Sequence, residues 1–167
     1  FANRTASGGE AIAEHVNTVA VAPGLSGRTY DRTVISLEKC RPASGEKLCL
    51  QFGEGATPTY TTTGYYWRNL INFTTATTGS NQSQIVLYDA TLGASDYLAG
   101  EINVFYGTNS VFGYFKLVRW YSSAALPDVC DGSFSVAITG IVNDMSIKIK
   151  SSAGGALSNA EYVVEGA

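Results

Sequence analysis

Residues 30–52 have the sequence YDRTVISLEKC (30–40), RPASGE (41–46) and KLCLQF (47–52). Apolar and polar side chains alternate in the first and third segments, which is the pattern of half-buried β-strands. The middle segment contains Pro42 and the pair Ser44-Gly45, which favour a turn. The stretch therefore predicts two antiparallel strands joined by a tight turn, and it indicates a β-sheet protein.

A turn at Ser44-Gly45 sets the register of this predicted hairpin and places Cys40 opposite Cys49. In that register the apolar residues share one face of the hairpin, because side chains alternate between the faces of a strand: Ile35, Leu37, Leu48, Leu50 and Phe52. We therefore expect Leu50 to be buried and Gln51 to be exposed. A disulfide between Cys40 and Cys49 is sterically allowed, whereas the odd total of three cysteines favours reduced thiols.

The composition also points to an all-β domain. The chain has 167 residues, of which 18 are Gly, 10 are Tyr and 7 are Phe, so it is long enough for one domain with a substantial core. The net charge is −3 and no basic patch is visible, which argues against a nucleic-acid partner. No apolar run approaches the roughly 20 residues that span a bilayer, so we expect no membrane insertion.

The alternating segments along the chain predict roughly ten short strands with no amphipathic helix between them. Residues 1–15 are interpreted as an arm or linker and residues 16–167 as one domain. The polar stretches 74–84 and 122–132 are expected to be loops. Short strands at this spacing favour a single antiparallel β-sandwich of jelly-roll-like type.

Four stretches, taken in order, resemble the small β-sandwich domain found near the C-termini of bacteriophage tail fibres and other phage structural proteins. They are the segment 30–50 described above, the aromatic stretch 60–67 after a Gly-rich turn, AGEINVFY at 99–106, and AITGI at 137–141 followed by SS, GG and a closing strand. Together they span about residues 16–167. The resemblance rests on their order and spacing, because each motif by itself is common.

This resemblance implies a non-catalytic structural protein of the virion, most often a homotrimer at the tail or capsid surface that contacts host glycan. It implies no cofactor. Two alternative functions are also consistent with the sequence: a capsid decoration or head-fibre protein that stabilises the shell, and a carbohydrate-binding module from a secreted enzyme.

Glycan contact is the small-molecule activity that the residues favour most. Sugars stack on Tyr and Trp rings while their hydroxyls meet polar side chains. Two groups in the sequence combine these residue types: Tyr65, Tyr66, Trp67 and Asn69 in one stretch, and Asp96 and Tyr97 in the other. The alternative for both groups is that the aromatic rings pack in the core or in a subunit interface.

Catalysis and metal binding have weaker support. The single histidine, His15, would have to serve any Ser-His-Asp arrangement. A pair of carboxylates could hydrolyse a glycoside without histidine, but no spacing singles out two of the loop aspartates: Asp89, Asp96, Asp128 and Asp131. The acidic stretch 128–132, even with Asn143 and Asp144, supplies too few oxygens for calcium.

Sparse charge and abundant tyrosine favour a protein that buries surface in an assembly. Lys and Arg together number only 11, so polar but uncharged sheet edges have few protecting charges. Aromatic side chains are enriched where subunits meet, and the candidates for such a contact are Tyr106, Phe112, Tyr114 and Trp120. We therefore expect a homo-oligomer with closed symmetry, and a trimer in particular.

Overall fold

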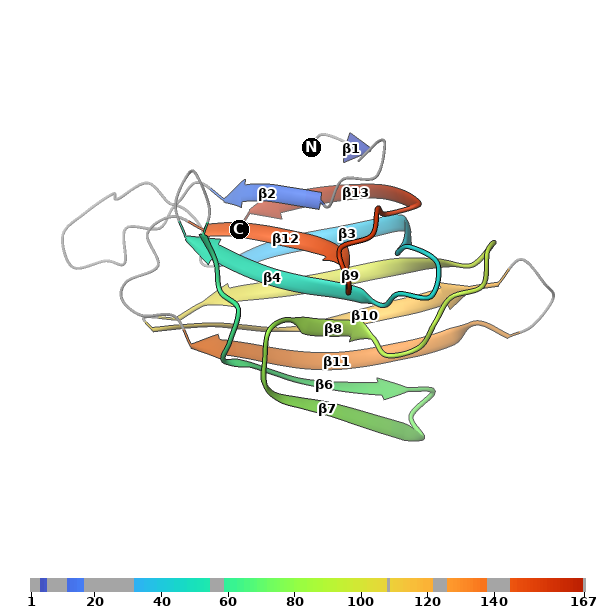
Figure 1. Cartoon of the computed structure of the whole chain (residues 1–167), viewed down its shortest axis with the longest axis horizontal. Coiled ribbons are helices and arrows are strands. Elements are labelled where there is room, and N and C mark those ends of the chain that lie inside the picture. The colour runs from blue at the N-terminus through green and yellow to red at the C-terminus, as the bar shows by residue number, and fades with distance from the viewer. Residues whose placement is uncertain are drawn as a thin grey trace.

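The computed structural model describes residues 4–5, 12–16, 32–54, 59–107, 109–121, 126–137 and 145–166. Within these ranges the chain forms two stacked antiparallel sheets, which confirms the all-β sandwich (Figure 1). The large sheet has eight strands in the order β1 (Arg4–Thr5), β13 (Asn159–Gly166), β3 (Arg32–Arg41), β9 (Tyr97–Tyr106), β10 (Ser110–Trp120), β11 (Asp128–Ala137), β6 (Tyr65–Ile71) and β7 (Thr75–Gln82). The small sheet has the order β2 (Ile12–Val16), β12 (Met145–Ser151), β4 (Leu48–Glu54) and β5 (Thr59–Tyr60), and β8 (Ile85–Tyr88) also pairs with β4.

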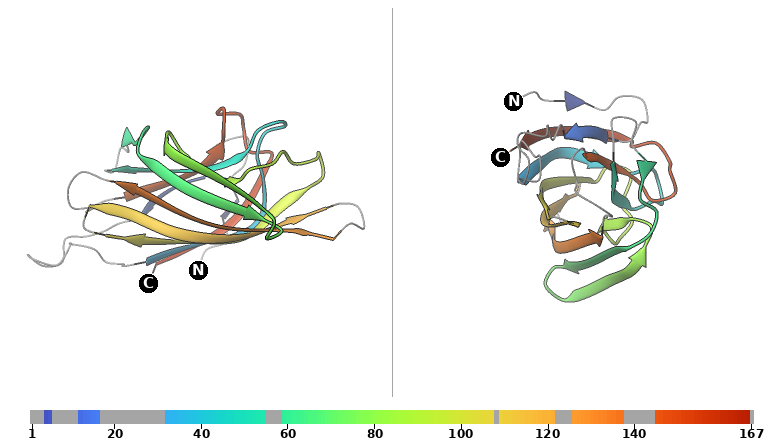
Figure 2. Two further views of the ribbon diagram at one scale, coloured as in Figure 1. Left: turned by 90° about the horizontal axis from the view of Figure 1, so that it is seen from below. Right: turned by 90° about the vertical axis from the view of Figure 1, so that its left-hand side faces the viewer.

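The end-on view shows the small sheet covering part of the large sheet, with the β6–β7 hairpin extending beyond it (Figure 2). Most strands that follow one another in the chain lie in different sheets, for example β3 and β4, β7 and β8, or β11 and β12. Such exchange between sheets is a jelly-roll-like feature. Strand β1 and all of β2 except Val16 lie in the stretch 1–15 that the sequence suggests as an arm, and the two strands pair with β13 and β12.

The predicted hairpin between residues 30 and 52 is wrong in its pairing. The turn itself is present, with Glu46 N donating to Ala43 O at 3.0 Å and Gly45 at a positive φ of 78°. However, β3 pairs with β13 and β9 in the large sheet, whereas β4 pairs with β12, β5 and β8 in the small sheet. The turn therefore joins the two layers of the sandwich.

The burial pattern that suggested the hairpin is nevertheless correct, because β3 and β4 bury their apolar residues in the same core from opposite sides. Ile35, Leu37, Leu48, Leu50 and Phe52 are all buried in that core. Gln51 departs from the expectation, since it is also buried. Its Nε2 donates to the carbonyl of Ser83 at 2.9 Å, so the segment before β8 covers this part of the outer face of the small sheet.

The three cysteines are free and buried, and the predicted pairing of Cys40 with Cys49 is not formed. Cys40 lies in β3 opposite Ala160 and Leu98, whereas Cys49 lies in β4 opposite Lys150 and Val86. Two predicted loops also contain strands. Most of residues 74–84 forms β7, and β11 begins at Asp128 inside the stretch 122–132.

Glycines in the large sheet make room for aromatic rings that fill the core. Phe115 lies directly opposite Gly132, and Phe134 lies directly opposite Gly113 on the neighbouring strand. A Cβ at either glycine would overlap the ring of its partner, so each ring lies flat across the opposite strand. Aromatic residues commonly compensate glycines in this way in β-sheets.

These rings continue into the small sheet and join the two layers. The rings of Phe115 and Phe134 stack with centroids 6.4 Å apart, and Phe52 of β4 approaches Phe134 to 5.8 Å. Aromatic pairs at such separations contribute about 0.5–1.5 kcal/mol beyond the burial of their area. Trp67 and Gly79 repeat the same ring-over-glycine pairing between β6 and β7.

We predict that Gly132→Ala destabilises the protein by about 1–3 kcal/mol, because the added methyl group overlaps the Phe115 ring in a filled core. The neighbouring exposed residue provides the control, and Ser133→Ala should change stability by about 0.5 kcal/mol or less. Urea unfolding of both variants measures the difference. Equal stabilities would show that the ring moves aside without cost.

We also predict that the three thiols do not react in the folded protein. Burial raises the pKa of Cys40, of Cys49 and of Cys130 to about 12, and for Cys49 this effect outweighs the opposing charges of Lys150 and Lys47. Thiolate is the reactive form, so a thiol reagent should label the cysteines only after unfolding. Labelling of the native protein, or an oxidised Cys40–Cys49 peptide in a digest, would contradict this arrangement.

Candidate functional site

The outer face of the large sheet carries most of the strongly exposed aromatic side chains of the described residues. Alternation along β10 sends Phe115 and Leu117 into the core, and it therefore sends Phe112, Tyr114 and Trp120 outward. Their exposed fractions are 46%, 50% and 59%. Exposed large apolar side chains that gather on one face mark candidate interaction sites, so this face is the natural place to look for a binding site.

A shallow groove of about 410 Å³ lies at one end of this face. Trp120 and Tyr97 lie opposite each other on β10 and β9, and Val118 lies opposite Ala99 in the next outward row. These four residues line the groove together with Glu38 and Lys39 of β3. The groove thus combines an apolar floor with one acidic and one basic side chain.

An irregularity in β3 places both charged residues at the groove. The register between β3 and β9 shifts between Leu37 and Cys40, so Glu38 and Lys39 are both exposed although they are consecutive. A regular strand would turn one of them inward. A β-bulge of this kind commonly redirects side chains beside functional sites.

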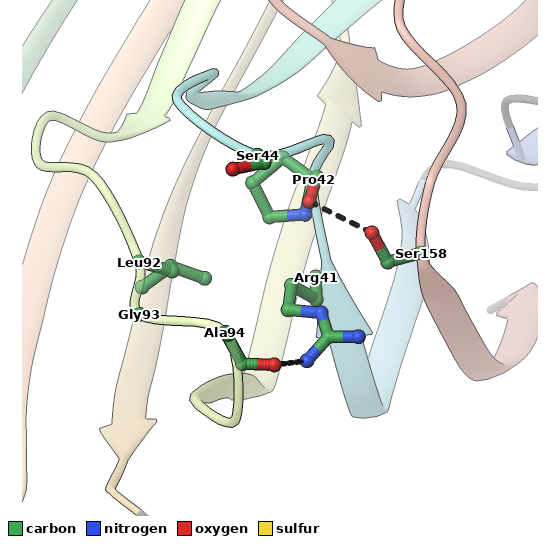
Figure 3. A pocket seen from close by; sticks show the side chains of 7 residues that line it. All are labelled: Arg41, Pro42, Ser44, Leu92, Gly93, Ala94 and Ser158. Atoms are coloured by element: carbon green, nitrogen blue, oxygen red, sulfur yellow. Dashed lines mark hydrogen bonds between the residues drawn. The ribbon is translucent and has the colours of Figure 1, made fainter.

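A second, smaller cleft of about 150 Å³ adjoins the groove through Arg41 (Figure 3). It lies between the β3–β4 turn and the β8–β9 loop and is lined by Arg41, Pro42, Ser44, Leu92, Gly93, Ala94 and Ser158. The Arg41 guanidinium donates to the carbonyl of Ala94 and lies 5.4 Å from the centre of the Tyr97 ring. Arg41 therefore holds the aromatic floor of the groove against the neighbouring loop.

A polar network closes the same end of the sandwich around Arg119. Its Nη2 lies 2.6 Å from Asp96 Oδ2, and its Nη1 lies 3.7 Å from Asp128 Oδ2. Asp128 also accepts hydrogen bonds from Tyr121, from Tyr88 at 3.1 Å, and from Asn72 at 2.6 Å. The network connects the β8–β9 loop, the end of β10, the start of β11 and the β6–β7 turn.

This network brings together Asp96 and Asp128, two of the four aspartates that the sequence suggested as hydrolytic groups, but its hydrogen bonds do not suit Asp128 for acid catalysis. Burial by itself raises the pKa of Asp128, yet the hydrogen bonds from Tyr121, Asn72 and Tyr88, with the charge of Arg119, outweigh it and hold that pKa below its ordinary value. A glycosidase acid needs a raised pKa. The arrangement therefore fits a structural role.

The other acidic candidates lie apart. Asp89 forms an ion pair with Lys47, and Asp131 lies on the outer face opposite Lys116. Among the described side chains, no group of three or more His, Cys, Asp or Glu could hold a metal ion. Asn143 and Asp144 lie outside the described residues, and His15 is placed only by its backbone, opposite Ser146.

The structure separates the residues that the sequence proposed for glycan contact. Tyr65 and Asn69 are fully buried, so surface contact is wrong for both. The hydroxyl of Tyr65 accepts from Phe52 N at 2.8 Å, and Asn69 Nδ2 donates to the carbonyl of Val86 at 2.6 Å. Trp67 packs against the core beside Gly79.

Of the remaining three, only Tyr97 lines the groove. Asp96 is buried and accepts hydrogen bonds from Arg119 and from Gly93 N at 2.9 Å, so it is wrongly placed for direct contact with a ligand. Tyr66 is 48% exposed but lies in another part of the outer face, in the row of Phe105 and Phe112.

The residues proposed for a subunit interface also divide into buried and exposed ones. Tyr106 is buried, and its hydroxyl lies 2.7 Å from Thr33 Oγ1, so its assignment to an interface is wrong. Phe112, Tyr114 and Trp120 are exposed. Phe112 stacks on Phe105 with ring centres 5.6 Å apart, which leaves one face of this aromatic pair accessible.

Four groove residues were not identified by sequence reasoning: Glu38, Lys39, Ala99 and Val118. The outward position of Val118 can be deduced from side-chain alternation, as for Trp120, once it is known that β10 turns Leu117 into the core. The bulge that exposes Glu38 and Lys39 is not marked by a glycine or proline within β3. The glycine at this point is Gly100 of β9, which lies opposite Leu37 with a positive φ of 139°, and it could be linked to the bulge only once the pairing of the two strands was known.

Comparison of the chain with protein-family models, with curated proteins and with solved structures finds no match in any of the three. Within the described residues, no helix is long and apolar enough to cross a membrane.

We predict that Asp128→Asn lowers stability by about 1–3 kcal/mol, because it weakens several hydrogen bonds at a mostly buried carboxylate. The folded protein binds the Asp128 proton more weakly than the unfolded chain does. The carboxylate therefore contributes its full stabilisation above the unfolded pKa of about 4 and loses it as the pH falls through the lower folded pKa.

Chemical denaturation of wild type and variant across the acidic range measures this effect. The two stabilities should differ most at neutral pH and converge at low pH. Asp131→Asn alters a half-buried carboxylate that lies on the outer face across from Lys116; it should cost about 1 kcal/mol or less and serves as the control. A difference that does not depend on pH would contradict the role given to Asp128.

Proposed function

We propose that the chain is a non-catalytic domain of a bacteriophage structural protein that binds host surface glycan through the Trp120–Tyr97 groove. The observation that carries the binding function is the exposed ring of Trp120, set across from Tyr97 in the groove. The assignment to a virion rests on the resemblance of the sequence to phage tail-fibre domains. The two-sheet sandwich is compatible with that resemblance.

The shape and chemistry of the groove suit a sugar ring. Its volume of about 410 Å³ lies within the usual range of small-ligand sites, about 300–1,000 Å³. Trp120 and Tyr97 supply aromatic faces for the C–H groups of a sugar, while Val118 and Ala99 keep the floor between them free of polar atoms. A binding site of this kind needs few polar groups to orient its ligand.

Those polar groups are present at the rim. The Glu38 carboxylate can accept hydrogen bonds from sugar hydroxyls, and the Lys39 ammonium can donate to them. The Arg41 guanidinium above the Tyr97 ring steadies the aromatic floor, because a cation over an aromatic face is attracted to it. A site held in place before the ligand arrives loses less entropy on binding.

A carbohydrate-binding module would use the same groove, so the groove by itself does not separate the two functions. Detection of the chain in purified phage particles by mass spectrometry tests the virion assignment. A particle that lacks the chain, or a chain fused to a catalytic domain, would favour the module.

We predict that Trp120→Ala weakens glycan binding by about tenfold or more, the usual cost of removing an aromatic residue at the centre of a contact. A bacterial glycan array identifies a ligand, and calorimetric titration then measures its affinity. Tyr66→Ala removes a comparably exposed aromatic residue outside the groove and should leave the affinity unchanged. Equal losses in both variants, or no binding to any glycan, would contradict the proposal.

A further inference from the structure

Strand β7 forms one edge of the large sheet. It is the last strand in the sheet order and pairs there with β6, and it lies along the lower border of the molecule in Figure 1. The register between the two strands is regular from Ile71–Thr75 to Trp67–Gly79 and shifts only beyond this run, near Asn81 with its positive φ of 52°. The regular part offers one row of backbone N–H and C=O groups to an incoming strand.

The β7 edge lacks the charged residues and the proline that commonly keep sheet edges from pairing. The sequence of β7 is TATTGSNQ, which contains no charged residue and no proline. Natural edge strands are commonly protected by lysine, proline, inward charges or a covering segment. The other end of the same sheet has such protection, since β13 carries Glu161 and Glu165 and is partly covered by β1.

The β7 edge is also held rigidly. Trp67 packs over Gly79, where a Cβ would overlap the indole ring. At the β6–β7 turn, Asn72 Oδ1 accepts from Val129 N at 2.9 Å, and Asn72 N donates to Val129 O at 2.8 Å. A preordered edge strand loses little entropy when it pairs, so its free backbone groups are available for association.

We propose that β7 pairs antiparallel with the β7 strand of a second copy of this chain, so that two large sheets become continuous across a twofold axis. Self-pairing suits this strand because it has no charge, and two copies therefore bring no like charges together. Its small side chains face one another without steric conflict, and Thr–Thr pairs across the axis are favourable in sheets. A twofold contact between identical strands also closes after two copies and leaves no β7 edge free.

A single new cysteine on β7 tests the contact directly. The native cysteines are buried, whereas Thr78 is exposed, so Thr78→Cys supplies one accessible thiol. At about 100 micromolar protein, a short bis-maleimide should convert Thr78→Cys to a covalent dimer. Thr91→Cys, which places a thiol on the exposed β8–β9 loop, should give far less dimer.

Added charge tests the same contact without cross-linking. The double variant Ala76→Lys/Thr78→Lys places four ammonium groups at the axis and should weaken the dimer at least tenfold in sedimentation equilibrium. Thr91→Lys/Ser95→Lys adds the same charge on an exposed loop and should leave the dimer intact. The wild-type chain should sediment as a dimer at about 100 micromolar, the range of a small reversible contact.

Three outcomes would overturn the proposal: a monomer at that concentration, a trimer that the lysines do not affect, or equal cross-linking of both cysteine variants. If the lysine variant fails to fold by circular dichroism, the cysteine pair decides. Neither experiment depends on glycan binding, so the groove and the edge are tested separately.

Discussion

The contact among Phe52, Phe134 and Phe115 is the interaction on which the arrangement of the two sheets depends. Phe52 belongs to the small sheet, and the other two rings belong to the large sheet. Each of those two rings lies across a glycine of the neighbouring strand. Because interiors are packed as densely as organic crystals, this pairing of rings and glycines determines how closely the layers approach.

The same packing determines what the outer face presents. Side chains alternate along a strand, so a β10 that buries Phe115 and Leu117 must expose Phe112, Tyr114 and Trp120. The floor of the groove, the aromatic pair of Phe105 and Phe112, and the charged row of Glu101, Lys116 and Asp131 all follow from this one register. The candidate binding surface is therefore a consequence of the core and of the strand order.

The polar network around Arg119 plays a complementary part at the open end of the sandwich. Hydrophobic packing cannot close this end, because loops and strand ends bring polar backbone there. Arg119 and Asp128 instead tie four segments together, and the neighbouring Arg41 supports Tyr97 beside the groove. The candidate site thus lies where the scaffold is most constrained, which suits a site that must keep its shape.

The sequence by itself determined the all-β class, the turn at Ser44-Gly45 and the burial of Ile35, Leu37, Leu48, Leu50 and Phe52, because each depends on local alternation or turn chemistry. It also pointed to Tyr97 as a candidate for glycan contact and to Trp120 as a candidate for a subunit interface. Only the tertiary structure decided that β3 and β4 lie in different sheets, since both pairings bury the same side chains. It likewise decided that Tyr65, Asn69 and Tyr106 are buried and that a bulge turns Glu38 and Lys39 toward the groove, because burial and register depend on strands that are distant in the chain.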